Sequence, residues 1–293
     1  GEGEPMLTDA QIAARKIGGS DIGIILGMNP YVTPTDLYRQ KIGEVPPFEG
    51  NEHTQAGEVM EGAIADLYSL RTGRKVRRSN ITHAHPVHDF LTANIDREVV
   101  GERRIVEIKN VGRHAAKQWG EPGTDEAPPW YLMQAHHYML VLDYPAADIV
   151  AYFGGGDLGV YPVERSADMD AIIIDAARTF WQCVQTKTPP PFDPNHPAAL
   201  DCLARLYPGT NGETVAGDDR LLAWTTVERD ASEALARYEK IKDGARAHLL
   251  SAMGEASILT LPDGSKWERK TVARKGFTVE ATEYTQLKWS KPK

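Results

Sequence analysis

Residues 90–111 read FLTANIDREVVGERRIVEIKNV and predict a β-hairpin. Two runs rich in Ile, Val and Thr flank Gly101 and Glu102, and glycine at the first central position is typical of a two-residue type II′ turn. This turn would set the register of the two strands, with Val100 facing Arg103, Glu98 facing Ile105, Asp96 facing Glu107 and Asn94 facing Lys109. Side chains two residues apart share a face of a strand, so Glu107 and Lys109 should project together beside Asp96 and Asn94.

Two carboxylates that face each other across a hairpin require an explanation, because opposed like charges destabilise a sheet. A divalent cation shared by Asp96 and Glu107 would supply one, since Mg²⁺ or Mn²⁺ is held by one or two carboxylates and keeps positions open for water and phosphate. Lys109 would then steady an attacking water or the charge that develops on phosphorus. Two alternatives remain at this point: a solvated hairpin with charged outer positions, and a one-residue bulge that breaks the pairing.

The composition is that of an ordinary globular protein, with 41% hydrophobic and 25% charged residues among 293. The net charge of −8 argues against a generally basic nucleic-acid binder, but the segment 71–117 holds 11 Lys or Arg and 5 Asp or Glu. A local basic surface of this kind can bind phosphates, and it can equally be a solvated face. We predict one domain over residues 1–193 and an extension over residues 194–293, in which the character of the sequence changes.

Two cysteines are too few for a disulfide framework, a Cys₄ zinc site or a four-cysteine iron–sulfur cluster. The sequence shows no apolar core of a signal peptide and no apolar run long enough for a membrane span. We therefore expect a protein of the reducing cytoplasm with no membrane partner.

Upstream of the hairpin, IGGSDIGIILG at 17–27 predicts a helix start with Ser20 as the N-cap. Such a start also suits a phosphate, and Arg15 could supply charge, although capping alone would explain Ser20. The range 55–71 predicts a helix with an apolar stripe formed by Ala56, Met60, Ala63, Ile64, Leu67 and Leu70. Glu61 borders this stripe, where it is either solvated, ion-paired or directed toward a metal site.

Downstream, residues 130–142 are apolar on nearly every side and predict a buried helix, in which Gln134 needs hydrogen-bonding partners in the core or in an active site. Further strands are expected at 148–153 and 159–163 and a helix at 169–185. In the extension, 219–253 predicts one long amphipathic helix or a helical pair, followed by a hairpin at 258–270 and a basic tail. His83, His85 and His88 alternate as zinc ligands could, but no cysteine or HExxH motif accompanies them.

Six short motifs appear in this order: RKIGGSD at 15–21, GMNPY at 27–31, GEVME at 57–61, ANID at 93–96, EIK at 107–109 and YLMQ at 131–134. With this ordered set the chain resembles the lambda-exonuclease-like, YqaJ-type viral recombinase family of the PD-(D/E)xK nuclease superfamily. The resemblance spans residues 15–134 and depends on the whole set, because EIK alone would be a weak signal. The chain departs from the pattern at Ile95, where the family has proline, and at Asn94, where it can have a phosphate-contacting serine.

The resemblance implies an α/β fold, a PD-(D/E)xK core with a mixed β-sheet flanked by helices, here carrying a C-terminal helical extension and hairpin. It implies a metal site made by Asp96, Glu107 and the main-chain carbonyl of Ile108, with Lys109 as the catalytic lysine. Glu61 and Gln134 would complete the site from two helices. Arg15, Ser20 and Asn94 fall where the family grips a terminal 5′ phosphate.

We therefore expect a Mg²⁺-dependent exonuclease, with Mn²⁺ as a substitute, that digests duplex DNA from 5′ to 3′ in phage recombination by single-strand annealing. Its partners would be duplex DNA ends, a single-strand annealing protein and other copies of itself, as in the ring trimer of relatives. The alternatives are an endonuclease, a Cas4-like nuclease, for which two cysteines are too few, and a non-catalytic DNA-binding or assembly protein.

Overall fold

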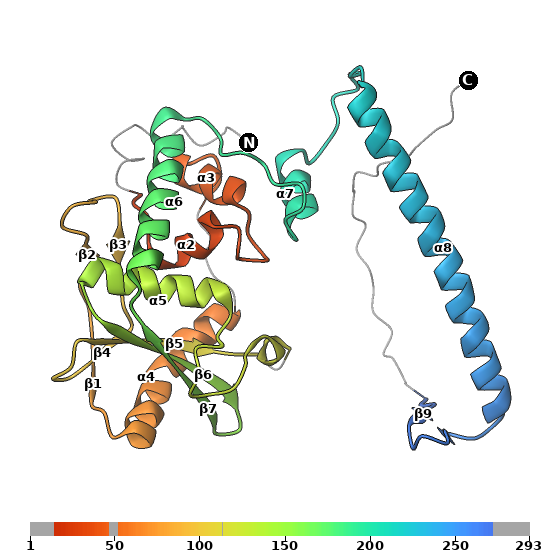
Figure 1. The fold of residues 1–293 in the computed structure, drawn as a ribbon, viewed down its shortest axis with the longest axis horizontal. Coiled ribbons are helices and arrows are strands. Elements are labelled where there is room, and N and C mark those ends of the chain that lie inside the picture. The colour runs from red at the N-terminus through yellow and green to blue at the C-terminus, as the bar shows by residue number, and fades with distance from the viewer. Residues whose placement is uncertain (1–14, 47–51, 113, 272–293) are drawn as a thin grey trace. The chain divides into compact units, whose positions relative to one another are not determined.

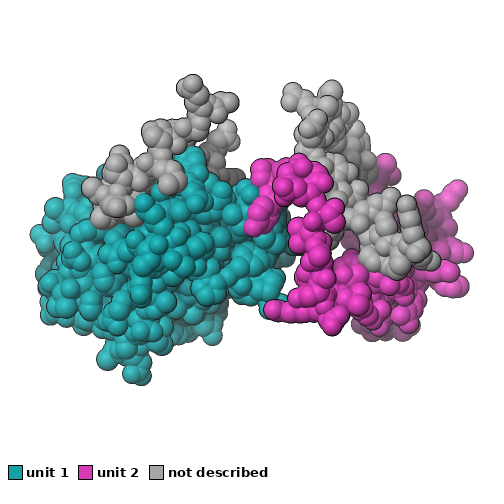
Figure 2. All heavy atoms as spheres, turned by 90° about the horizontal axis from the view of Figure 1, so that it is seen from above, with its two compact units in different colours: residues 1–206 teal, residues 207–293 magenta. Residues whose placement is uncertain are grey.

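The computed structural model describes residues 15–46, 52–112 and 114–271. The chain divides into two compact units, Gly1–Leu206 and Tyr207–Lys293, which Figure 2 colours separately. The first unit therefore extends past the boundary predicted after residue 193. The reason is α7 (Ala199–Leu206), which packs on the first unit. Its Arg205 forms an ion pair with Asp36 at 2.8 Å, and Thr33 donates a hydrogen bond to the Cys202 sulfur at 3.2 Å.

The first unit is built on a mixed five-stranded sheet, the α/β architecture that the sequence predicts (Figure 1). Its strands, in spatial order, are β1 (Val76–Arg78), β4 (Arg97–Val99), β5 (Arg104–Asn110), β6 (Ala146–Gly154) and β7 (Asp157–Glu164). Only β5 and β6 are parallel, and α5 (Pro129–Leu142) lies in the connection between them. A separate two-stranded sheet pairs β2 (His83–Ala84) with β3 (Thr92–Ala93).

The central hairpin has the predicted register at its two ladder pairs, but Asn94 and Asp96 precede β4 and do not extend the ladder to Lys109 and Glu107, and the turn differs as well. Arg97 faces Val106 and Glu98 faces Ile105, as expected. The turn, however, runs from Val99 to Glu102, whose N–H donates to the Val99 carbonyl at 3.4 Å. Gly101, with φ of 85°, is thus its third residue, so the type II′ assignment was wrong. The connection is longer than two residues, and Arg103 leaves the ladder to bind Asp143.

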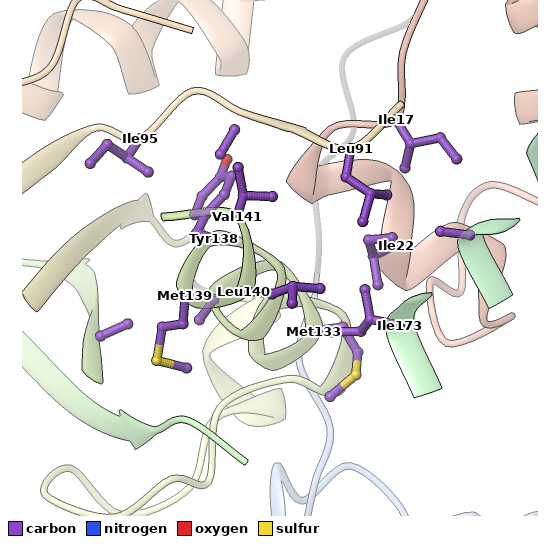
Figure 3. Close-up of a cluster of buried hydrophobic side chains, with 14 of the residues drawn as sticks. Ile17, Ile22, Leu91, Ile95, Met133, Tyr138, Met139, Leu140, Val141 and Ile173 are labelled. Carbon is purple, nitrogen blue, oxygen red and sulfur yellow. The ribbon is translucent and has the colours of Figure 1, made fainter. Parts of the chain in front are cut away.

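Helices cover both faces of the sheet. On one face, α4 (Glu52–Thr72) buries Ile64, Ala65 and Tyr68 against Val106 and Ile108 of the sheet. On the other face lies α5, whose residues 133–141 are buried as predicted, with α2 (Gly19–Ile25), α3 (Pro34–Ile42) and α6 (Ala167–Thr186) around it. Figure 3 shows part of this second core, including Met133 beside Ile173. Alternate residues of β5 therefore face different helices.

Two glycines let α2 approach α5 closely. A Cβ atom added at Gly19 would lie 2.3 Å from Cε1 of Tyr138, and one at Gly23 would lie 2.6 Å from Cβ of Trp130. The helix begins one residue before Ser20, after an N-cap at Gly18, whose N–H donates to the Asp21 carboxylate at 2.8 Å. Ser20 is therefore an exposed residue of the first turn, and the prediction that it is the N-cap was wrong.

The second unit contains α8 (Asp219–Met253), a single helix rather than a pair, and the predicted hairpin of β8 (Ile258–Thr260) and β9 (Lys266–Glu268). The basic tail beyond residue 271 lies outside the described residues. Of the helices described here, none combines the length and the apolar character needed to cross a bilayer.

Candidate active site

Glu107 lies at the centre of the candidate site, in the middle of β5. Because it alternates with Val106 and Ile108, its side chain faces α5, and it is only 3% exposed. One carboxylate oxygen, Oε1, accepts hydrogen bonds from Lys109 Nζ and from Gln134 Nε2, both at 2.7 Å. The other oxygen, Oε2, is buried and has no hydrogen-bond partner among the described residues. Glu107 therefore has an open acceptor inside the protein.

Lys109 and Gln134 complete a closed triangle with Glu107. The Lys109 ammonium also donates to Oε1 of Gln134 at 3.1 Å and lies 4.6 Å from the centre of the Tyr131 ring. Gln134 donates in addition to the hydroxyl of Tyr138 at 2.9 Å. This set of partners explains why a glutamine is tolerated in the buried helix α5, and it fixes the position of the lysine.

Asp96 approaches the same edge of β5 from the residue before β4. Its Oδ2 accepts a hydrogen bond from the main-chain N–H of Ile108 at 2.8 Å. In an extended strand the N–H and C=O of one residue point to the same side, so the Ile108 carbonyl is directed toward this edge as well. The structure thus brings together Asp96, Glu107, Lys109, Gln134 and the main chain of Ile108.

Glu61 is on the other face of the sheet, in α4. Its carboxylate accepts a hydrogen bond from Arg97, a buried residue that also donates to the Asp96 carbonyl at 2.7 Å. Of the readings left open for Glu61, the ion-paired one is therefore observed. The pair ties α4 to the backbone of Asp96, and the charge of Glu61 adds to the burial that raises the pKa values of Asp96 and Glu107.

The ionisation of the three charged groups reflects their burial. Burial raises the pKa of the Glu107 carboxyl to about 7, although the Lys109 ammonium opposes this shift. Burial also raises the pKa of Asp96, again against the charge of Lys109. For Lys109, burial favours the neutral amine, but the Glu107 and Asp96 carboxylates outweigh it and raise its pKa. The charge of Lys109 is thus too small to keep the pKa values of both carboxyl groups at their ordinary level.

These features fit a hard divalent cation. Asp96, Glu107 and the Ile108 carbonyl offer oxygen atoms only, which Mg²⁺ and Mn²⁺ accept, and the unpartnered Oε2 of Glu107 is one such atom. In the ranges that the structure describes, no cluster of three or more His, Cys, Asp or Glu side chains is arranged as ligands. The site therefore suits a cation that keeps several waters, and the zinc reading of His83, His85 and His88 gains no support.

The residues expected at a terminal phosphate lie in neighbouring segments. Ile17 pairs with Leu91, which places the strand-like segment after Arg15 beside the segment leading to Asn94. Arg15 donates to the Gln40 carbonyl, and both Ser20 and Asn94 are exposed. Gly19 lies close to Tyr138, whose hydroxyl accepts a hydrogen bond from Gln134. The start of α2 therefore adjoins the turn of α5 that carries Gln134 and Tyr138.

Three residues of the site were not expected from the sequence: Arg97, Tyr131 and Tyr138. Tyr138 stands four residues after Gln134 on α5, a spacing that places two side chains on one helix face. That spacing was a usable signal for Tyr138. No comparable signal pointed to Arg97, because its ion pair with Glu61 depends on α4 packing against the face of the sheet opposite to Glu107.

The basic segment 71–117 is less available than its charge suggests. Many of its arginines form ion pairs within the fold: Arg74 and Arg104 with Asp148, Arg77 with Glu98, Arg97 with Glu61 and Arg103 with Asp143. Among the described cations of this segment, the exposed side chains of Lys75, Arg78 and Lys117 form no ion pair or hydrogen bond with described residues, whereas Arg71 donates to the Leu158 carbonyl. These three remain as candidates for contact with a phosphate backbone.

Comparison with known proteins gives the same assignment for this region. Residues 10–145 match the family model described as the YqaJ-like viral recombinase domain. The protein YqaJ of Bacillus subtilis (strain 168), itself described as uncharacterized, is 31% identical over 235 residues, which cover 78% of this chain and 73% of that protein. An alkaline exonuclease, LHK-Exo from Laribacter hongkongensis, superposes with a TM-score of 0.50 and 19% identity over 68% of this chain and all of the exonuclease, so the two share a fold. The predicted α/β fold is thereby confirmed, and the chain belongs to the YqaJ-like viral recombinase family.

Proposed function

We propose that this chain is a Mg²⁺-dependent DNA exonuclease that digests duplex DNA from 5′ to 3′ and leaves a single strand for an annealing partner. The observation that carries the proposal is the buried set of Asp96, Glu107 and Lys109, in which Oε2 of Glu107 lacks a partner. Membership of a recombinase family and a fold shared with an alkaline exonuclease support it.

Asp96, Glu107 and the Ile108 carbonyl would hold the cation, with Mn²⁺ as a substitute. When bound, such an ion lowers the pKa of a coordinated water and stabilises the departing oxygen of the phosphodiester. Lys109, held by Glu107 and Gln134, orients the attacking water by hydrogen bonding and neutralises charge on the phosphate. Glu61 and Arg97 hold the backbone of Asp96 in place.

Arg15 would bind a terminal 5′ phosphate, because its guanidinium is permanently charged and offers a planar array of donors. Ser20 and Asn94 would add neutral donors from the adjoining segments. Lys75, Arg78 and Lys117 would contact the DNA backbone without reading its sequence.

The deciding experiment offers three duplexes to the full chain: linear with a 5′ phosphate, linear with a 5′ hydroxyl, and closed circular. With Mg²⁺, both linear forms should be degraded and the circle should stay intact, whereas EDTA or Ca²⁺ should prevent digestion. Asp96→Asn should abolish hydrolysis and keep DNA binding, while the matched change Asp157→Asn at an exposed position should alter neither. Nicking of the circle would indicate an endonuclease, and lack of any digestion would indicate a non-catalytic protein.

The 5′-phosphate site has its own test. A charged hydrogen bond contributes roughly 1.5 to 3 kcal/mol, so the 5′-hydroxyl duplex should start about tenfold to a hundredfold more slowly. Arg15→Ala should remove most of this preference. Equal starting rates of the wild type on both ends would refute the role of Arg15.

A further inference from the structure

The helix α8 carries an apolar seam that no described residue of the second unit covers. Trp224, Val227, Tyr238 and Ile241 are 56–69% exposed, and Met253 is the buried residue of this helix. The β8–β9 hairpin lies against the last turns, where Trp267 lines a pocket with Leu250 and Met253. Along the rest of α8 the apolar side chains face away from the described residues of this unit. Such a contiguous apolar surface marks an interaction site.

The seam has the spacing of a coiled coil. Trp224, Ala231, Tyr238 and Ala245 recur at seven-residue intervals, and Val227, Ala234, Ile241 and His248 follow each of them by three residues. These are the a and d positions of a heptad repeat, which pack against a second helix. We propose that the occupant is α8 of a second copy of this chain, running antiparallel, so that the two helices form a symmetric dimer.

Side-chain size favours the antiparallel direction. When two α8 helices are centred on Ala236, which is the middle residue of Asp219–Met253, a positions of one helix face d positions of the other over the whole length. Val227 then faces Ala245, Ala231 faces Ile241, Ala234 faces Tyr238, and Trp224 faces His248 of the second copy. Most layers therefore pair a large side chain with a small one, as close packing requires.

Charge complementarity points in the same direction. The e positions of α8 are Leu221, Glu228, Leu235, Lys242 and Leu249, and in an antiparallel pair e positions lie beside e positions. Glu228 of each helix then lies near Lys242 of the other, Leu221 near Leu249, and Leu235 near its own copy at the twofold axis. This is the reciprocal pattern of a twofold interface. The two Arg237 side chains come close near the axis and extend into solvent.

A parallel pair is less favourable. It would stack Tyr238 on Tyr238 and Ala231 on Ala231, and it would bring Arg237 against Lys242 of the second copy. It would also separate Glu228 from Lys242 along the helix axis. A contact between Glu228 of one copy and Lys242 of the other therefore distinguishes the antiparallel from the parallel direction.

The test measures the mass of the full chain by sedimentation equilibrium across micromolar concentrations. We expect chains to pair through α8, which gives a dimer of the 32.3 kDa chain or, where the ring trimer expected from the resemblance also forms, a pair of trimers. Lys242→Glu should raise the dissociation constant about tenfold, because it places a glutamate beside Glu228 at both symmetric contacts of the dimer. The double variant Glu228→Lys with Lys242→Glu should restore it to within about threefold. Lys240→Glu makes the same charge change at an exposed position outside the seam and should have no effect.

Circular dichroism should show the same helix content in all variants, so that a change of mass reports pairing and not unfolding. A monomer at every concentration would overturn the proposal, as would an assembly whose mass is insensitive to Lys242→Glu. Failure of the double variant to restore the wild-type constant would overturn the antiparallel direction. Because these readouts do not involve DNA, they are independent of the proposed nuclease activity.

Discussion

The pH at which the cation binds should report the ionisation of Glu107. Burial raises the pKa of this carboxyl to about 7 from an ordinary value of 4.5. A cation binds the ionised form, so protons compete with it below the raised pKa and cease to compete above it. Between pH 8 and pH 6 the ionised fraction falls from roughly nine-tenths to one-tenth, so the apparent dissociation constant for Mn²⁺ should rise about tenfold. The raised pKa of Asp96 would add a further loss at lower pH.

Calorimetric titration with Mn²⁺ at pH 6, 7 and 8, in two buffers of different ionisation enthalpy, measures both the affinity and the protons released. About one proton per ion should leave the protein at pH 6 and almost none at pH 8. Glu107→Gln should bind poorly at every pH, while Glu164→Gln, at an exposed position, should behave as the wild type. An affinity that is independent of pH, with no proton release at pH 6, would refute the assignment of Glu107 as a ligand.

Gly23→Ala should lower stability by about 1 to 3 kcal/mol, because the new methyl group meets the backbone and Cβ of Trp130, whereas Gly62→Ala, in open space on α4, should raise it by up to about 1 kcal/mol. Thermal melting of both variants checks this pair, and equal shifts would contradict the close approach of α2 and α5. Gln134→Ala should lower the rate of DNA cleavage about tenfold to a hundredfold with little change in DNA affinity, since it frees Lys109 and Glu107 from their shared partner; an unchanged rate would show that the glutamine has only a packing role. Burial lowers the pKa of His137 to about 4 from 6.5, so the free energy of unfolding should fall by up to about 3 kcal/mol as the pH falls through this interval, where the unfolded state binds a proton and the folded state does not. Urea unfolding of wild type and His137→Gln between pH 7 and pH 4 should show a free energy of unfolding that falls less steeply with decreasing pH in the variant. An identical dependence on pH in both proteins would argue against a neutral buried histidine.

The strand periodicity of residues 104–110 was sufficient to place Glu107 and Lys109 on one face of the strand. A single polar residue in an apolar run drew attention to Gln134, but only the resemblance assigned it to the site rather than to the core. The turn was harder, because Arg103 does not continue the ladder and instead binds Asp143, forty residues away. Local pattern describes the strand but not the partners that a loop residue finds elsewhere in the chain.

The errors at the helices have a common physical origin. The glycines before Ser20 suggested that the helix begins after an N-cap at Ser20, yet the helix includes Gly19, which, like Gly23, is required because α5 passes close by. On α4 the predicted stripe included Leu70, which is 81% exposed, while Tyr68, outside the stripe, is fully buried and donates to Asp148. Which helix face is buried depends on the neighbouring elements, and the sequence of one helix does not contain this information.

The charges of the site explain why its arrangement is costly without a cation. Glu61 and Arg97 neutralise each other, and Lys109 neutralises one carboxylate, which leaves one negative charge shared by Asp96 and Glu107 in a buried place. Near neutral pH a proton on Glu107 can remove this charge, consistent with its raised pKa. An apolar residue of similar volume would avoid the charge altogether, and such replacements of buried charges are often stabilising. The stability of the fold thus gives no reason for a second carboxylate beside Asp96, whereas a divalent cation that displaces the proton does.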